Sequence, residues 1–472
     1  MRRLLSLFLV LCCMMSLVGC GSAQKTDGET QVEGTQQSAQ PLPETEETGP
    51  ETEEAPVDSA EESTEEAPVP EVVVPQEYMI YDPTVMPEGG VRDGVTYVEY
   101  NGVVEHLFFH PVVAYPELAF DGDYKSDGID DWMVTAGEYV KILESLHEKG
   151  YVLVDIMDCW REETDESGQA RMVKNTLYLP EGTKPLIFSY DDVNYYEYML
   201  TNGFTHKLIL GEDGKLWSWG LDPQGKEVIS RDLDAVTILD KFVEEHPDFS
   251  PFGAKGCLSI TGYEGILGYR TQTDSENWTP EREAKRQEEI VAVKPIVEEL
   301  KRTGWTFGSH TWGHISLNTR TYEKVVSDME RWFDEVGTLV GETTVLFYPF
   351  GGRLDGDDVK QTGPAFQWMQ EQGFRIFCSV GIDSWSKCKD DISAVICDRL
   401  HPDGTTLRSA KSRERYMRFY DAKDIIDLEA RPQREVGWLT EPAAPVEPAP
   451  AEIVPVETEP AEAMPAEQKE TP

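Results

Sequence analysis

The sequence predicts an α/β fold, a distorted (β/α) barrel of seven or eight strands with a β-meander insertion, flanked by disordered acidic tails. Two observations support this prediction. Amphipathic helical stretches alternate with short apolar strands, and polar side chains follow the carboxyl ends of several of these strands. Such alternation builds a parallel sheet with both faces covered. In barrels of this kind, active sites form where the carboxyl ends of the strands meet.

Three helix-to-strand transitions show the alternation most clearly. The helical stretches 138–146, 296–300 and 366–369 each end near a glycine, and an apolar strand led by an aromatic residue then begins. The glycines are Gly150, Gly304 and Gly373. Glycine after a helix can adopt the left-handed capping conformation. We therefore expect three helices that stop at these positions and feed directly into the sheet.

The stretch 195–233 breaks this alternation, and we assign it to the insertion. Short apolar runs are separated there by turns that contain Asp213-Gly214 and Pro223. This pattern is typical of an antiparallel meander. Because the insertion follows a strand end, we expect it over the mouth of the barrel, where it either shapes a substrate cleft or decorates the surface.

The amino terminus, residues 1–19, has the form of a signal peptide. Two arginines precede the apolar stretch 4–15, which is too short to span a membrane. The tetrapeptide 17–20, Leu-Val-Gly-Cys, resembles a bacterial lipobox, in which Cys20 carries the lipid. We therefore expect an extracytoplasmic protein that is lipid-anchored to the bacterial cell membrane.

Acidic segments of low complexity, 20–76 and 441–472, flank the predicted barrel at 77–440. Residues 21–76 contain fifteen acidic residues and one lysine, and 441–472 contain eight glutamates and one lysine. Such segments bury too little apolar surface to offset their ordering entropy, so we predict disorder. The formal net charge of −46 at pH 7 argues against nucleic acid as a partner. We interpret the first segment as a spacer between lipid and barrel.

The cysteines do not define a disulfide framework. Five lie within 77–440, namely Cys159, Cys257, Cys378, Cys388 and Cys397. An odd number leaves at least one without an intramolecular bridge, and no zinc-finger spacing is present. Export permits disulfides, but buried cysteines also occur simply as small apolar residues. The sequence therefore assigns no pairing.

Metal-binding side chains follow two of the predicted strands. Asp191 and Asp192 end one strand, and His310 and His314 follow another. One carboxylate and two imidazoles can hold a divalent metal with positions left open. The second carboxylate is then available as a base toward water. Taken alone, the aspartates could cap a helix and the histidines could share a helix face, but together they outline a metal-assisted hydrolase.

The order of three motifs resembles the polysaccharide deacetylases of carbohydrate esterase family four, which have a nodulation-protein-type domain. The motifs are Ser189-Tyr190-Asp191-Asp192-Val193, His310-Thr311-Trp312-Gly313-His314 and Tyr348-Pro349-Phe350-Gly351. The resemblance covers most of residues 104–430. It is strongest to the branch that deacetylates poly-N-acetylglucosamine, which opens with an aromatic–histidine pair, here Phe109-His110.

The resemblance implies roles for these residues. Asp192, His310 and His314 would bind zinc, or cobalt, nickel or manganese in its place, and Asp191 would be the general base. The backbone N–H of Phe350 would stabilise the oxyanion. The residues expected around the oxyanion and the substrate are Tyr348, Pro349, Phe350, Thr311 and Trp312, with Thr311 orienting a ligand or holding the loop.

Three features depart from the family pattern. Val193 stands where the family has glycine, and Phe347 stands where many members have an arginine that steadies the base. The general-acid motif has one candidate, centred on His401, which could equally be a surface turn residue. His110 is a further catalytic candidate, either orienting Asp191 or contacting the substrate.

We therefore expect metal-dependent removal of acetyl groups, above all N-acetyl groups, from a polysaccharide such as poly-N-acetylglucosamine or peptidoglycan. The alternative is an inactive deacetylase-fold protein that binds glycan or serves as a scaffold. The complete ligand set favours the enzyme, whereas Val193 and the unclear acid favour the alternative. Four aromatic residues either stack on sugar rings or belong to the core: Tyr195, Tyr196, Trp312 and Trp385.

Overall fold

The computed structural model describes residues 81–357, 361–389 and 392–440. The expected signal peptide, the lipid-bearing Cys20 and the two acidic tails lie outside the described residues. Within these ranges, no helix combines the length and the apolar character needed to cross a membrane.

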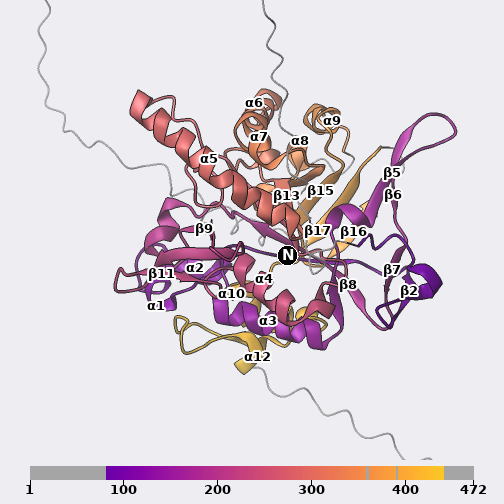
Figure 1. The fold of residues 1–472 in the computed structure, drawn as a ribbon, viewed down its shortest axis with the longest axis horizontal. Helices are drawn as coiled ribbons and strands as arrows, with labels where there is room; N and C mark the ends of the chain where they lie inside the picture. Colours follow the sequence, from indigo (N-terminus) through magenta and orange to yellow (C-terminus); the bar gives the residue numbers. More distant parts are fainter. Residues whose placement is uncertain (1–80, 358–360, 390–391, 441–472) are drawn as a thin grey trace, which may run out of the picture. The chain divides into compact units, whose positions relative to one another are not determined.

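A curved sheet of parallel strands forms the centre of the fold (Figure 1). Its strands are β3 (Glu105–Phe109), β8 (Lys184–Asp191), β12 (Gly256–Ile260), β13 (Trp305–Ser309), β14 (Val345–Phe347), β15 (Ile376–Val380) and β17 (Val395–Arg399). They are ordered β17-β15-β14-β13-β12-β8-β3, and every neighbouring pair is parallel. A short strand, β4 (Tyr151–Leu153), also pairs with β8, and β16 (Trp385–Cys388) adds an antiparallel edge to β17. The predicted α/β barrel architecture is confirmed.

The sheet curls until its first and last parallel strands meet. The Phe108 amide donates to the Leu400 carbonyl at 2.9 Å, and the Leu400 amide donates to the His106 carbonyl at 3.0 Å. These bonds nearly close the barrel. They also bring His401, which follows Leu400, next to His110, which follows β3.

Alternate residues of the strands point into the barrel or out toward the helices, as the period of a strand requires. The interior is mainly apolar and includes Ile187, Val345, Phe347, Ile376, Cys378, Val395 and Cys397. The outward residues pack in a separate, larger core under the helices. At the carboxyl end of the sheet, the polar residues of the site continue the rows of side chains that point into the barrel.

Helices cover the outside of the barrel (Figure 1). The longer ones are α3 (Ala136–Glu148), α4 (Ala235–Glu245), α5 (Pro280–Arg302), α6 (Tyr322–Trp332) and α9 (Pro364–Glu371). The shorter ones are α1 (Pro116–Ala119), α2 (Ser126–Trp132), α7 (Thr338–Val340), α8 (Leu354–Asp357), α10 (Gly404–Arg408), α11 (Ala410–Tyr416), α12 (Ala422–Ile425) and α13 (Gly437–Thr440). Gly150, Gly304 and Gly373 have φ of 73°, 96° and 98°, which confirms the predicted left-handed glycines after three of these helices.

The predicted meander is present as β9 (Lys207–Leu210), β10 (Leu216–Leu221) and β11 (Glu227–Ser230), all antiparallel. On one side the Leu208 amide of β9 donates to the carbonyl of Leu267, in the loop that follows β12, at 3.2 Å. The meander packs against α4 and α5, and Ser218 of β10 is hydrogen-bonded to Thr237 of α4 at 2.8 Å. It lies against helices because Leu208 and Leu216 join their apolar core.

Two small antiparallel sheets were not predicted from the sequence. One contains β1 (Val91–Arg92), β2 (Val95–Tyr100) and β7 (Leu177–Pro180), and the other is the hairpin of β5 (Trp160–Thr164) and β6 (Ala170–Lys174). They contribute Tyr97, Trp160, Met172, Leu177 and Leu179 to the apolar cluster that fills the barrel interior.

A buried ion network ties the carboxyl-terminal part of the fold to the helices that precede β4. The fully buried Arg431 donates to Asp130 at 2.8 Å and to Glu138 at 2.7 Å, and both carboxylates are also fully buried. Arg408 supplies a second guanidinium to Asp130. Gly404 is required beside it, because a Cβ there would collide with the Asp130 carbonyl. Removal of one partner would leave buried charge uncompensated.

We expect Arg431→Met to lower the free energy of unfolding by about 3–5 kcal/mol, because Asp130 and Glu138 keep their buried charges without this partner. Chemical denaturation measures the change. The control is Arg282→Met, which breaks the exposed pair with Asp274 and should leave the midpoint nearly unchanged. Equal, small effects of both substitutions would contradict the structural role of the network.

Candidate active site

The two adjacent aspartates stand at the carboxyl end of β8. Asp191 is its last residue, and Asp192 follows with φ of 62°, in the left-handed region. Consecutive residues of an extended strand point to opposite faces. The left-handed turn at Asp192 changes that direction, and the Asp192 amide is anchored on the Ser259 carbonyl at 3.1 Å. Both carboxylates thereby face the histidines that follow β13.

Asp191 is paired with an arginine that the sequence analysis did not identify. Arg399, the fully buried last residue of β17, donates to both Asp191 oxygens at 2.7 and 2.9 Å. Its guanidinium lies 4.1 Å from the Phe108 ring and 4.6 Å from the Phe347 ring. Burial alone would raise the pKa of Asp191, but Arg399, the strongest opposing influence, holds that pKa well below its ordinary value.

The structure therefore revises the expectation about Phe347. The ring of Phe347 packs on the guanidinium of Arg399, which comes from another strand, so Asp191 has an arginine partner although position 347 supplies none. The available signal was a basic residue at the end of an apolar strand. An arginine that points into solvent can also stand at the end of an apolar strand. The sequence therefore could not show that Arg399 pairs with Asp191.

The two histidines of the second motif present imidazole nitrogens toward the aspartates. His310 Nδ1 lies 2.9 Å from the Phe347 carbonyl, which can only accept, so Nδ1 carries the proton. The other ring nitrogen, Nε2, faces Asp191 Oδ2 at 3.9 Å. His314 Nε2 lies 3.8 Å from Asp192 Oδ2, and burial lowers the pKa of His314. Neutral imidazoles with Nε2 available are the form that binds metals.

The donor set fits a divalent metal. Ligand atoms of Asp192, His310 and His314 all lie within 4.8 Å of one another. The Tyr196 hydroxyl donates to Asp192 Oδ1 at 2.6 Å, while Oδ2 faces His314. One carboxylate oxygen is thus fixed by the protein and the other is directed at the imidazoles. A carboxylate with two neutral imidazoles is a ligand set used by zinc and by other divalent transition metals.

The loop between the two histidines is held by α6. The Asp328 carboxylate accepts from the amides of Trp312 and Gly313 at 2.7 and 3.2 Å. Thr311 Oγ1 accepts from the Ile315 amide at 3.1 Å, in keeping with the loop-holding alternative for Thr311.

The side chain of Trp312 is engaged by the protein itself. The Arg331 guanidinium lies 3.4 Å from its ring centroid, and its Nε1–H donates to Glu335 at 2.8 Å. The half-buried indole therefore supports the loop, and one of its faces is already covered.

A chain of polar groups runs from the barrel closure into the site. Asp403 Oδ2 lies 3.0 Å from His401 Nδ1, and His401 Nε2 lies 3.0 Å from His110 Nδ1. His110 Nε2 is 3.9 Å from Asp192 Oδ2. Burial, followed by the neighbouring His401, lowers the pKa of His110 to about 4. His401 is 7% exposed and stacks on Phe108, so it is not a surface turn residue.

The Pro349–Gly351 turn forms another wall of the site. Phe350 has φ of 58°, is 55% exposed, and its ring lies 4.5 Å from that of His314. The Ser379 hydroxyl donates to the Gly351 carbonyl at 2.7 Å and fixes the turn. By contrast, Tyr348 is fully buried and stacks on Phe377 in the outer core, so its side chain is not in the site, contrary to expectation.

Other residues considered from the sequence take different positions. Tyr195 and Tyr196 are buried, which corrects the option that they stack on sugar rings. Val193 is also buried, in the core between sheet and helices. Trp385 is 39% exposed and donates to Asp398 at 2.8 Å.

Three solved structures are similar to this chain at low sequence identity. Deacetylase PplD of Streptococcus pyogenes, in complex with acetate, is 12% identical and matches 66% of this chain and 95% of its own, with a TM-score of 0.34. A polysaccharide deacetylase from Bacillus cereus is 14% identical over 70% and 71%, with a TM-score of 0.36. IcaB from Ammonifex degensii is 13% identical over 69% and 97%, with a TM-score of 0.34. No curated protein sequence matches the chain.

The family is indicated by one segment of the sequence. Residues 274–363 match the family model described as polysaccharide deacetylase. The segment contains His310, His314 and the turn at Phe350, whereas Asp191 and Asp192 precede it. Residues 274–363 are therefore similar to part of a polysaccharide deacetylase.

Proposed function

We propose that the protein is a metal-dependent hydrolase that removes acetyl groups, above all N-acetyl groups, from a cell-surface or extracellular polysaccharide. The observation that carries the proposal is the convergence of Asp192, His310 and His314 beside an Asp191 that Arg399 keeps ionised. A polysaccharide deacetylase segment that contains both histidines supports it. Poly-N-acetylglucosamine and peptidoglycan are the substrates we would test first.

The proposed roles follow from the positions of the groups. Asp192, His310 and His314 would hold the ion, zinc in our proposal, with cobalt, nickel or manganese as substitutes. An ion bound there supplies Lewis acidity to water and to the acyl carbonyl. Asp191 takes the proton from the attacking water, and Arg399 keeps Asp191 in the charged form that can accept it.

Stabilisation of the oxyanion and protonation of the leaving nitrogen are assigned to residues on opposite walls of the site. The amide of Phe350 is proposed to donate to the carbonyl oxygen as negative charge develops on it. When the carbon–nitrogen bond breaks, the leaving nitrogen needs a proton. His110 is the imidazole that faces the site, and it is linked through His401 to Asp403, so we propose that this chain passes to the leaving nitrogen the proton that Asp191 has taken from water. The products are acetate and an amino sugar.

The two arguments for a non-catalytic protein, Val193 and the unclear general acid, carry less weight once the positions of the side chains are known. Val193 was the main argument for lost turnover, but its side chain is buried away from the site. The base has an arginine partner in Arg399, and His401 has a carboxylate partner in Asp403. These three findings favour an active enzyme. We further propose that Cys20 anchors this enzyme by lipid on the extracytoplasmic side of the cell membrane.

We expect Asp191→Asn to reduce acetate release from acetylated glucosamine oligomers or peptidoglycan by at least about 100-fold, because the amide cannot accept the proton from water. Bound metal should remain. The control is Asp383→Asn, an exposed acid after β15 that is paired with Arg418. Full turnover by Asp191→Asn would remove this residue as the base, and loss in both variants would point to a general defect.

His314→Ala should lower the metal content of the purified protein, because one imidazole of the proposed ligand set is lost. Elemental analysis of protein dialysed against metal-free buffer measures the stoichiometry. His206→Ala is the control, since that imidazole contacts the Leu200 carbonyl and lies outside the group. Equal metal content in the wild type and in His314→Ala would exclude His314 as a ligand.

Arg399→Gln should move the acid limb of the kcat/KM profile to higher pH. Arg399 holds the pKa of Asp191 down against the effect of burial, so its loss raises that pKa, and the base is protonated at a higher pH. Initial rates across pH measure the shift, with Arg418→Gln as the control. An unchanged acid limb in a folded Arg399→Gln protein would contradict the proposed role of the pair.

A further inference from the structure

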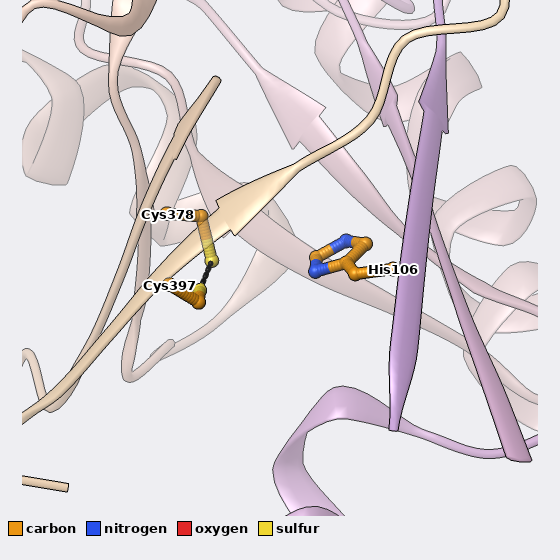
Figure 2. A group of neighbouring side chains, drawn as sticks. All are labelled: His106, Cys378 and Cys397. Carbon is orange, nitrogen blue, oxygen red and sulfur yellow. Dashed lines mark hydrogen bonds between the residues drawn. The ribbon is translucent and has the colours of Figure 1, made fainter. Parts of the chain in front are cut away.

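Cys378 and Cys397 lie directly opposite each other inside the barrel. Cys378 is on β15 and Cys397 on the neighbouring parallel strand β17, where the two residues are register partners. Both are buried, and Cys397 Sγ donates to Cys378 Sγ at 3.0 Å. Figure 2 shows the two sulfur atoms directed at each other, with His106 of β3 beside the pair.

This placement fits the requirements of a disulfide. Paired strands run about 4.7–4.9 Å apart, and bridged cysteines usually have Cα atoms about 4.4–6.8 Å apart. Register partners satisfy that condition without movement of either strand. The sulfur atoms need to approach by only about one ångström, which small side-chain rotations supply.

We propose that Cys378 and Cys397 form a disulfide that joins β15 to β17 beneath Arg399. The other interior cysteines face elsewhere: Cys257 Sγ lies near Gly308, and Cys159 Sγ–H donates to the Asp155 carbonyl at 3.4 Å. The bridge does not depend on the proposed deacetylase activity. It closes a loop whose ends are 19 residues apart in sequence and which contains the edge strand β16.

The bond forms by exchange with the disulfide of an external oxidant. One cysteine thiolate attacks the oxidant and releases one of its sulfurs as a thiol, after which the second cysteine attacks the mixed disulfide and releases the other. The protein sulfurs lose two electrons, and the two protons end on the two thiols of the reduced oxidant.

Burial determines when this exchange takes place. In the folded barrel the pair is inaccessible, and burial raises the pKa of the Cys378 thiol, which disfavours the attacking thiolate. The exchange therefore belongs to folding, before Leu400 pairs with β3 and closes the interior. Once formed, the bridge is shielded from soluble reductants by the same packing.

The same cysteines offer a competing chemistry. With His106 they form a group whose ligand atoms lie within 4.8 Å, a set that could hold a soft metal ion. Metal binding requires two thiolates, whereas a disulfide has none, so the two states exclude each other. The shorter sulfur–sulfur approach, and the hydrogen bond of His106 Nε2 to Ser189 Oγ at 2.9 Å, favour the disulfide.

Peptide mapping tests the bridge directly. The full chain is purified without reductant from an oxidising secretory compartment, unfolded, alkylated and digested with trypsin. The proposal predicts a linked pair of peptides, 376–387 and 390–399, two hydrogens lighter than their sum and separated by reduction. Cys388 falls into a different peptide, 388–389, so it cannot be mistaken for either partner. Recovery of both peptides with alkylated cysteines would overturn the proposal.

Thermal unfolding provides a second measurement. Cys397→Ala should lower the Tm by roughly 5 °C, and adding Cys378→Ala should cost little more, because the bridge is already lost. Cys257→Ala is the matched control for removing a buried sulfur, and refolding it in reductant should lower its Tm as much as it lowers that of the wild type. Additive losses from the two single variants, with the same Tm for wild type refolded with and without reductant, would overturn the bridge. Zinc that the wild type holds and Cys397→Ala loses, with Cys378 and Cys397 of the wild type alkylatable after unfolding, would assign the metal state instead.

Discussion

The ion pair between Asp191 and Arg399 is the interaction on which the rest of the site depends. Both groups are buried, so neither could remain charged without the other, and two hydrogen bonds fix their relative orientation. The aromatic rings of Phe108 and Phe347 exclude water from the guanidinium. Arg399 also directly precedes Leu400, which closes the barrel. The charge state of Asp191 and the closure of the sheet are therefore properties of the same few residues.

Backbone strain occurs at four residues close to this pair. Asp192, Thr311, His314 and Phe350 all have positive φ, which costs of order 1–3 kcal/mol for each residue other than glycine. The surrounding structure offsets that cost: the Asp192 amide is bound by Ser259, and the histidine loop is bound by Asp328. Four strained residues at the end of one barrel are a reason to regard this end as functional, independently of any motif.

The sequence predicted the features that depend on local pattern. Alternating helices and apolar strands gave the barrel, and strand-end residues correctly placed the two aspartates beside the two histidines. What it missed depends on contacts between distant residues. Arg399 stands 208 positions after Asp191, and no local pattern indicates which strand will lie opposite another when a sheet closes. Tyr348 was misplaced for a related reason, since a three-residue strand is too short to show which side faces inward.

The closure between β3 and β17 has a consequence for motion. It is a narrow seam, and the two sides of the site stand on either edge of it, with His110 on one and His401 on the other. Local opening of a protein begins where few backbone bonds must break. Transient parting of this seam would interrupt the path between Asp403 and the interior while leaving both histidines that follow β13 in place. The fold thus holds His110 and His401 together across a seam of two backbone hydrogen bonds, whereas the two histidines that follow β13 do not depend on that seam.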